Sequence, residues 1–308
     1  MLITIFTPTY NRAHLLPRLY ESLCKQSVLD TDLSPFEWLI VDDGSVDNTE
    51  EVVQGFIAEQ TIPIRYFKKP NGGKHTAINL GAKEAEGELF WILDSDDSLP
   101  TNAVETVIRC WGTDINIAAD PIGKISKTET AGICGYMAHH DGTIIGIPVV
   151  EKPIYASSLD LRYKLHITGD MMEVFRTEVM REFPFPEIIG ERFCSEALVW
   201  NRIAAKYKLF LIPDIIYYRD YLDGGLTDNI VRIRMKSPIA AMMTYAELFV
   251  AKTDNNTLLP FATRLKAAIN YWRFAFCAKE RNVKIASWGK LLMPLGWLMH
   301  IADKRKVN

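Results

Sequence analysis

The chain has 308 residues, of which 48% are hydrophobic and 24% are charged, and its formal net charge at pH 7 is −3. This composition is ordinary for a soluble globular protein of one large domain or a domain with an appendage, and the charge gives no reason to expect a nucleic acid as partner. Five scattered cysteines, none in a zinc-binding spacing, exclude a disulfide framework and favour a reducing cytoplasm.

Apolar strand patterns alternate with helical patterns through the first 111 residues. The expected strands are residues 2–7, 36–41, 62–67 and 90–93. The first expected helix ends near residue 27, and the others cover 47–59, 74–86 and 101–111. The chain starts directly with a strand, so no signal peptide is expected, and no stretch reaches the roughly 18 apolar residues of a membrane span. The alternation predicts an α/β fold, a parallel sheet with helices on both faces.

A polar motif follows each of the four strands. The motifs are Thr7-Pro8-Thr9, Asp42-Asp43-Gly44-Ser45, Asn71-Gly72-Gly73-Lys74 and Asp94-Ser95-Asp96. Because the carboxyl ends of parallel strands meet at one edge of the sheet, we expect these motifs to form one site there. A random scatter of turn residues would not bring carboxylates, glycines and a lysine together in this way.

Three carboxylates stand within four positions after the fourth strand, at Asp94, Asp96 and Asp97. Crowded carboxylates are costly to ionise unless a cation lies between them, and Mg²⁺ and Mn²⁺ favour such oxygen ligands. By itself the stretch is equally typical of a polar turn that caps the next helix. The other motifs expected at the same edge favour the cation site.

Three segments in this order carry a resemblance to a known family: Thr7-Pro8-Thr9-Tyr10-Asn11-Arg12, Val41-Asp42-Asp43-Gly44-Ser45 and Leu93-Asp94-Ser95-Asp96-Asp97. They resemble the signature of family 2 glycosyltransferases of the bacterial surface or capsular polysaccharide type, which have the GT-A fold. The resemblance covers roughly residues 1–220. It implies a Rossmann-like, mostly parallel sheet and an inverting transfer from a nucleotide-diphosphate sugar, usually UDP-linked, with a divalent cation.

The resemblance implies a nucleotide pocket at the ends of the first two strands. Asp43 would hydrogen-bond the base with Asp42 in support, and Thr7, Pro8 and Tyr10 would line the pocket. Asp42 is equally typical of a turn or cap residue, and Pro8 and Tyr10 are equally typical of packing residues.

The resemblance also implies a phosphate and metal site. Gly73 and Lys74 open a helix, so that backbone N–H groups and an ammonium face an anion; His75, which follows, fits the ribose or solvent, with solvent favoured. In the family's DxD motif the last carboxylate is the most direct metal ligand, which selects Asp96. Asp94 would then approach the ribose, or the metal through water, and Ser95 would belong to the nucleotide-sugar-binding residues.

A catalytic base is expected at the start of a helix at residues 197–206, where many family members carry a Glu-Asp pair. Here the pair reads Ser195-Glu196, so Glu196 takes the position of the base that deprotonates the acceptor hydroxyl. Glu is one methylene longer than the commoner Asp, which leaves Glu191 and Asp170 as alternatives. An acid in the first turn of a helix is also favoured by the helix dipole alone.

The rest of the first 228 residues predicts further strands and a loop over the site. Residues 131–138 and 143–150 are expected to form a hairpin, and 171–175, 209–212 and 215–218 to be strands. The segment from Arg219 to Thr227, which contains glycines and Tyr221, is interpreted as a lid over the diphosphate or equally as an ordinary surface loop.

The last 80 residues show no further strand pattern, and we expect a GT-A catalytic domain at 1–228 and a helical C-terminal appendage at 229–308. Helices are expected at 230–250 and 258–279. The tail at 288–301 is rich in Leu, Met and Trp, contains Lys290, and is followed by Lys304-Arg305-Lys306. That pattern is typical of a helix at a membrane surface, or of one packed on the domain or on a second subunit.

The expected function is an inverting, Mn²⁺- or Mg²⁺-dependent glycosyltransferase of the hexosyl or N-acetylhexosaminyl type. It would transfer a sugar from a UDP-sugar to a hydroxyl of a glycan or lipid-linked acceptor in polysaccharide or capsule biosynthesis, in the cytoplasm or at the inner face of the plasma membrane, as a monomer or homo-oligomer. A sugar-1-phosphate nucleotidyltransferase is an alternative, but it would need a glycine-rich basic loop where Thr7-Pro8-Thr9-Tyr10-Asn11 stands. A non-catalytic nucleotide-sugar binding protein is the alternative from another class.

Overall fold

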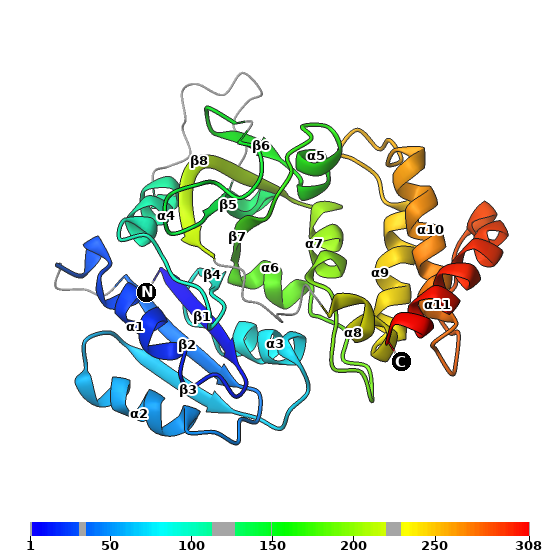
Figure 1. The fold of residues 1–308 in the computed structure, drawn as a ribbon. Coiled ribbons are helices and arrows are strands. Elements are labelled where there is room, and N and C mark those ends of the chain that lie inside the picture. The colour runs from blue at the N-terminus through cyan, green and yellow to red at the C-terminus, as the bar shows by residue number, and fades with distance from the viewer. Residues whose placement is uncertain (1, 31–34, 113–126, 149, 220–228, 308) are drawn as a thin grey trace.

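The computed structural model describes residues 2–30, 35–112, 127–148, 150–219 and 229–307. Its centre is one mixed eight-stranded sheet with the strand order β3-β2-β1-β4-β7-β5-β8-β6 (Figure 1). The strands are β1 Ile3–Thr9, β2 Phe36–Asp42, β3 Ile64–Lys68, β4 Leu89–Ile92, β5 Thr130–Ala138, β6 Ile154–Ala156, β7 Met171–Arg176 and β8 Lys208–Tyr218.

The first four strands form the predicted parallel part. β1 lies between β2 and β4 and pairs in parallel with both, and β3 pairs in parallel with β2. All four therefore end at the same edge, as the alternation of strand and helix requires. Beyond β4 the direction changes, because β7 runs antiparallel to both β4 and β5.

Helices cover both faces of the sheet, and the alternation of side chains along the strands makes two cores. Ile3, Ile5 and Trp38 point to the face covered by α1 Leu16–Cys24, α2 Thr49–Glu59 and α4 Ala103–Gly112. Phe6, Leu39 and Phe90 point to the face covered by α3 Lys74–Glu84, α6 Thr177–Glu182 and α7 Glu196–Ala204. Short helices complete this part of the chain: η1 Ser27–Asp30, η2 Lys127–Glu129 and α5 Ser158–Tyr163.

Two strand predictions are wrong. The two strands expected at 209–212 and 215–218 are parts of one strand, β8, whose pairing with β5 shifts register near Tyr136 instead of breaking. Of the expected strand at 143–150, Ile144 makes one isolated bridge to Ala138. This segment packs on another turn instead: a Cβ on Gly146 would lie 2.0 Å from the carbonyl oxygen of Thr168.

The C-terminal helices form a layer beside the sheet (Figure 1). They are α8 Ile230–Lys236, α9 Pro238–Val250, α10 Phe261–Ala275, η3 Ser287–Leu292 and α11 Met293–Val307. The single helix expected at 230–250 is wrong, because Ser237 leaves helical geometry and Pro238, which lacks an N–H, begins a new helix. α10 ends at Ala275, four residues before the predicted end at 279.

The helical layer is joined to the sheet domain by an ion pair. In α7, Arg202 donates two hydrogen bonds to the carboxylate of Glu247 in α9, from Nε at 2.8 Å and from Nη2 at 2.6 Å. The predicted boundary at residue 228 lies outside the described residues. None of the helices in the described ranges combines the length and the apolar character needed to cross a bilayer.

Candidate active site

The strand-end motifs meet at the predicted edge of the sheet, and Asp43 joins two of them. Its Oδ1 accepts hydrogen bonds from the backbone N–H of Gly72 at 2.9 Å and from Lys69 Nζ at 2.6 Å. Its Oδ2 accepts from the backbone N–H of Gly73 at 2.7 Å. The carboxylate is buried, and its contacts hold the Asn71–Lys74 turn against the end of β2.

Asp42 is buried under the same edge. Its Oδ1 accepts from the backbone N–H of Ser45 at 2.7 Å, which is the geometry of a turn residue, and its Oδ2 accepts from the Tyr66 hydroxyl at 2.7 Å. Burial, together with the charge of Asp42, raises the pKa of that hydroxyl. Asp42 therefore supports the loop that carries Asp43, as one of its two predicted roles requires.

The residues expected to line the base pocket differ in exposure. Thr7 is fully buried and accepts a hydrogen bond from Trp38 Nε1 at 2.9 Å, so it packs under the site. Pro8 lies inside β1 and is buried, whereas Tyr10, just past the strand, exposes 45% of its surface. Tyr10 is the one of the three with a side chain available to a ligand.

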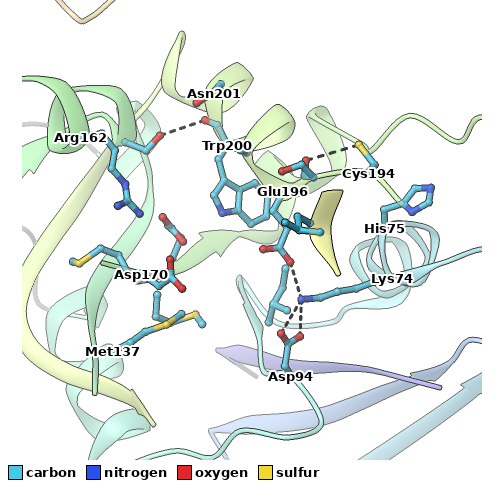
Figure 2. Close-up of a pocket in the computed structure, with 18 of the residues that line it drawn as sticks. Lys74, His75, Asp94, Met137, Arg162, Asp170, Cys194, Glu196, Trp200 and Asn201 are labelled. Carbon is cyan, nitrogen blue, oxygen red and sulfur yellow. Dashed lines mark hydrogen bonds and ion pairs between the residues drawn. The ribbon is translucent and has the colours of Figure 1, made fainter. Parts of the chain in front are cut away.

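Lys74 lies at the start of α3 and joins the two sides of the site (Figure 2). Its Nζ lies 2.7 Å from Oδ1 of Asp94 and 2.8 Å from Oε1 of Glu196. Burial opposes the charge of Lys74, but the two carboxylates outweigh it and raise the pKa of the ammonium. Burial likewise opposes ionisation of Asp94, but the charges of Lys74, Arg219 and Arg12 keep the pKa of Asp94 below its ordinary value.

Gly73 makes the contact between Lys74 and Glu196 possible. Its φ is +98°, and a Cβ there would lie 2.0 Å from the carbonyl oxygen of Arg192. Without a side chain at this position, the segment before α7 approaches the start of α3 closely enough for Glu196 to reach the ammonium. His75 is buried, so the expectation of a solvent position is wrong.

The acidic cluster after β4 has the oxygen ligands of a divalent cation site. One carboxylate oxygen from each of Asp94, Asp96 and Asp97 lies within 4.8 Å of the others. Burial first, and then the charge of Asp94, raise the pKa of Asp97 to about 7. A cation between these oxygens would relieve that repulsion, so the donor set fits Mg²⁺ or Mn²⁺.

The acidic cluster also has contacts with residues that are far from it in the sequence. Arg12 Nη1 lies 2.9 Å from Oδ2 of Asp96 and 3.4 Å from the Ser95 hydroxyl. The hydroxyl of Tyr217, in β8, donates to Oδ2 of Asp97 at 2.7 Å and accepts from the backbone N–H of Asp94 at 3.0 Å. Ser95 itself is buried.

Of the three candidate bases, only Glu196 contacts Lys74. Glu191 is buried and caps α9, accepting from the backbone N–H groups of Ile239 and Ala240 at 2.7 and 2.9 Å. Burial raises its pKa. Asp170 lies at the start of β7 and pairs with Arg219 at 2.5 Å. Tyr221 and most of the predicted lid lie outside the described residues.

A cavity of about 1050 Å³ opens beside these groups (Figure 2). Its lining includes Lys74, Asp94 and Glu196, and also Arg162, Trp200 and Glu173. Burial raises the pKa of Glu173 to about 8; Arg162 opposes the shift and Glu196 adds to it. Glu173 is therefore a carboxyl that holds its proton at neutral pH.

Sequence reasoning missed Lys69, Arg12, Tyr217 and Glu173 as site residues. Arg12 ends the first of the three family-like segments and Lys69 precedes the Asn71–Lys74 turn, so their position at the ends of β1 and β3 could have indicated a place in the site. Glu173 lies in β7 and Tyr217 in β8, and the sequence pattern does not show how these two strands are arranged relative to β4.

Residues 4–146 match the model of glycosyl transferase family 2. An uncharacterized glycosyltransferase MG025 homolog of Mycoplasma pneumoniae is 35% identical over 120 residues, 38% of this chain and 39% of that protein. The chain thus spans about two fifths of that relative's length. The GalNAc(5)-diNAcBac-PP-undecaprenol beta-1,3-glucosyltransferase of Campylobacter jejuni is 25% identical over 288 residues, 89% of this chain and 83% of that protein.

Solved structures share the fold at low sequence identity. S. aureus TarS 1-349 in complex with UDP-GlcNAc has a TM-score of 0.58 and 16% identity and covers 99% of this chain and 92% of its own. The mannosyltransferase PcManGT of Pyrobaculum calidifontis in complex with GDP-Man and Mn²⁺ has a TM-score of 0.55 and 17% identity. The match covers 98% of this chain and 75% of that one. The family model, the relatives and the shared fold confirm the resemblance: the chain carries a glycosyl transferase family 2 domain with the GT-A fold.

Proposed function

We propose that the protein is an inverting glycosyltransferase that moves one sugar from a nucleotide-diphosphate sugar, preferably a UDP-sugar, to an acceptor hydroxyl. The observation that carries the proposal is the contact of Lys74 with both Asp94 and Glu196 in the wall of one cavity. It brings an ammonium suited to a diphosphate and a carboxylate suited to a base within reach of the same reacting centre.

The donor side is built from the strand-end motifs. Tyr10 offers an exposed ring for the base, and Asp43 holds the Gly72–Gly73 turn and keeps the N-terminus of α3 pointed at the phosphates. Bound donors of this kind are named for neighbours of the same fold, UDP-GlcNAc for TarS and GDP-Man with Mn²⁺ for PcManGT.

The acidic cluster would hold the divalent cation, with Asp96 as its most direct ligand and Asp94 beside the sugar nucleotide. When bound, such a cation neutralises charge that develops on the leaving diphosphate. Lys74 adds a fixed positive charge on the same side. Arg12, which pairs with Asp96 in this structure, is placed to contact the diphosphate once Asp96 turns to the cation.

Glu196 is proposed as the base. Lys74 holds its carboxylate in the cavity wall beside the proposed donor site. An acceptor hydroxyl in the cavity would give its proton to Glu196 as its oxygen attacks the anomeric carbon from the face opposite the leaving group. That geometry inverts the configuration at the anomeric carbon.

The acceptor is proposed to be a glycan or a lipid-linked sugar in surface polysaccharide assembly. Trp200 offers an aromatic face in the cavity wall, and protonated Glu173 offers a hydrogen-bond donor. The Campylobacter relative, similar over most of both chains, is named for an undecaprenol-linked acceptor. Five free cysteines fit the proposed cytoplasmic location.

The decisive test is a thermal-shift screen of nucleotides and UDP-sugars on wild type and Asp96→Ala, each with Mn²⁺ and with EDTA. A ligand that binds only the folded state raises its apparent stability. We expect a shift with UDP and one UDP-sugar that needs Mn²⁺ and is lost in Asp96→Ala. Asp141→Ala, in an exposed turn, is the matched control.

That screen is followed by a turnover assay with the UDP-sugar it selects. Release of UDP by wild type and its loss in Glu196→Gln would support transfer. Binding that is the same in both proteins, with no turnover in either, would instead indicate a non-catalytic nucleotide-sugar binding protein. No shift with any uridine nucleotide would overturn the proposed donor class.

A further inference from the structure

The end of η3 and the last helix, α11, present an apolar surface to the outside of the molecule. Residues 291–302 contain no charged side chain, and their one polar side chain, that of His300, is buried. The exposed fractions are large for apolar residues: Leu291 78%, Leu298 57%, Trp297 49% and Leu295 48%. We call these four residues the outer apolar surface. An apolar patch of this kind normally marks a binding surface.

α11 packs on α10 through its inner side, and the outer apolar surface takes no part in that contact. A Cβ on Gly296 would lie 2.3 Å from Cβ of Trp272, so α11 approaches α10 closely at that point. Further along, Asp303 is buried and accepts from Nη2 of Arg273 at 2.7 Å. Figure 1 shows α11 at the edge of the molecule, on the side of α10 away from the sheet.

Positive charge flanks the outer apolar surface at both ends. Lys290 precedes it, and Lys304, Arg305 and Lys306 follow it, all four exposed. The acidic residue of this segment, Asp303, is already paired with Arg273. The segment is thus cationic, although the whole chain carries a net charge of −3.

An apolar helix flanked by cations suits the surface of an anionic lipid bilayer. At 15 residues α11 is about 22 Å long, shorter than the roughly 30 Å hydrocarbon core, so it would lie in the interface and not cross it. A symmetric contact between two copies through the same surface would place the same cations near each other, which is unfavourable. Anionic lipids instead attract every one of them.

We propose that the outer apolar surface and the cations around it dock the protein on an anionic membrane surface. The same helical layer that carries this surface also supplies Ile233 and Leu248 to the cavity wall. Docking through α11 would therefore keep the cavity close to the lipid phase. Membrane docking requires no donor and no turnover, so it can be tested separately from the transfer reaction.

The test is sedimentation of the full chain with vesicles of phosphatidylcholine alone and of phosphatidylcholine mixed with phosphatidylglycerol. We expect wild type to pellet with the anionic vesicles and much less with the neutral ones. The double variant Leu295→Gln/Leu298→Gln should weaken binding by about tenfold for each leucine. The triple variant Lys304→Gln/Arg305→Gln/Lys306→Gln should lose about fivefold for each cation and most of the salt dependence.

Matched controls separate the surface from general effects of substitution. Ile189 is fully exposed in another part of the molecule, so Ile189→Gln should pellet like wild type. Trp297→Phe should retain binding but lose part of the blue shift in tryptophan emission that lipid causes. Circular dichroism should show the same melting for all variants, since every substituted side chain is exposed.

Two outcomes would overturn the proposal. One is equal sedimentation of wild type and the double leucine variant with anionic vesicles. The other is a lipid-free dimer in analytical ultracentrifugation that the leucine variant dissociates, which would assign the surface to a second copy of the chain.

Discussion

Lys74 Nζ lies 2.8 Å from Oε1 of Glu196 and 2.7 Å from Oδ1 of Asp94, so one ammonium links the proposed base to the proposed metal cluster. When a diphosphate arrives, its oxygens compete with Glu196 for this ammonium. Donor binding would then release the Glu196 carboxylate for the acceptor. Under the proposed function, this contact predicts that the donor binds before the acceptor.

Lys74→Gln should lower kcat/KM for the UDP-sugar by about a hundredfold, because a fixed charge aimed at the leaving group is removed. It should also lower the melting temperature, since Asp94 and Glu196 lose their shared cation. Lys83→Gln, on the same helix but 79% exposed, is the control and should change neither quantity. Steady-state kinetics and thermal denaturation measure both, and an unchanged kcat/KM would remove Lys74 from the donor site.

Glu196→Gln and Glu191→Gln should have opposite effects. The first should reduce kcat by about a thousandfold while donor affinity measured by calorimetry stays near that of wild type, as expected for a lost base. The second should leave kcat near wild type and cost about 1–2 kcal/mol of stability, because Glu191 caps α9. A large loss of kcat in Glu191→Gln alone would transfer the role of base to Glu191.

Gly73→Ala should unfold or distort the site far more than a glycine substitution elsewhere. Both Gly73 and Gly142 have a positive φ, +98° and +86°, but a Cβ at Gly142 meets open space, whereas at Gly73 it meets the Arg192 carbonyl. Gly142→Ala should therefore cost about 1–2 kcal/mol, from backbone strain alone. Gly73→Ala should cost more than about 3 kcal/mol. Urea unfolding of both variants compares them, and equal losses would contradict the close contact.

Glu173→Gln should stabilise the protein in a pH-dependent way. In the folded protein the pKa of Glu173 is about 8, above the roughly 4.3 of an unfolded chain. The folded state therefore holds the proton more tightly, and this group lowers stability progressively as pH rises from about 4 to 8. The variant should match wild type near pH 4 and exceed it by up to about 5 kcal/mol above pH 8, since each pKa unit of difference corresponds to about 1.4 kcal/mol. Urea unfolding across this range checks it; a constant difference would count against the raised pKa.

The donor side of the site was predictable because its residues follow strands in a regular alternation. Once β1, β2, β3 and β4 are placed in parallel, the ends that carry Asp43, Lys74 and Asp94 lie at one edge of the sheet. The acceptor side was not predictable to the same degree. Its residues come from β7 and α5 and from helices of the last third, and no local pattern fixes that β7 inserts antiparallel beside β4.

Errors of detail had local physical causes. The apolar helical pattern runs from 230 to 250, but Pro238 has no N–H to donate to a helical hydrogen bond. A new helix therefore begins at Pro238. The segment at 143–150 had the composition of a strand, but Gly146 packs on the turn at Thr168–Gly169 instead of pairing. In both cases one residue changed the local structure that the composition of the surrounding segment predicts.

The reversal of direction at β7 has an evolutionary consequence. Because β7 runs opposite to β4, its beginning and not its end reaches the site, so Asp170 enters from a separate loop. The match to the family model ends at residue 146, before Asp170, Glu173 and Glu196. Under the proposed function, selection could rebuild the later segments for a new acceptor while the earlier segments keep the same donor. Related enzymes could then form different products from one activated sugar.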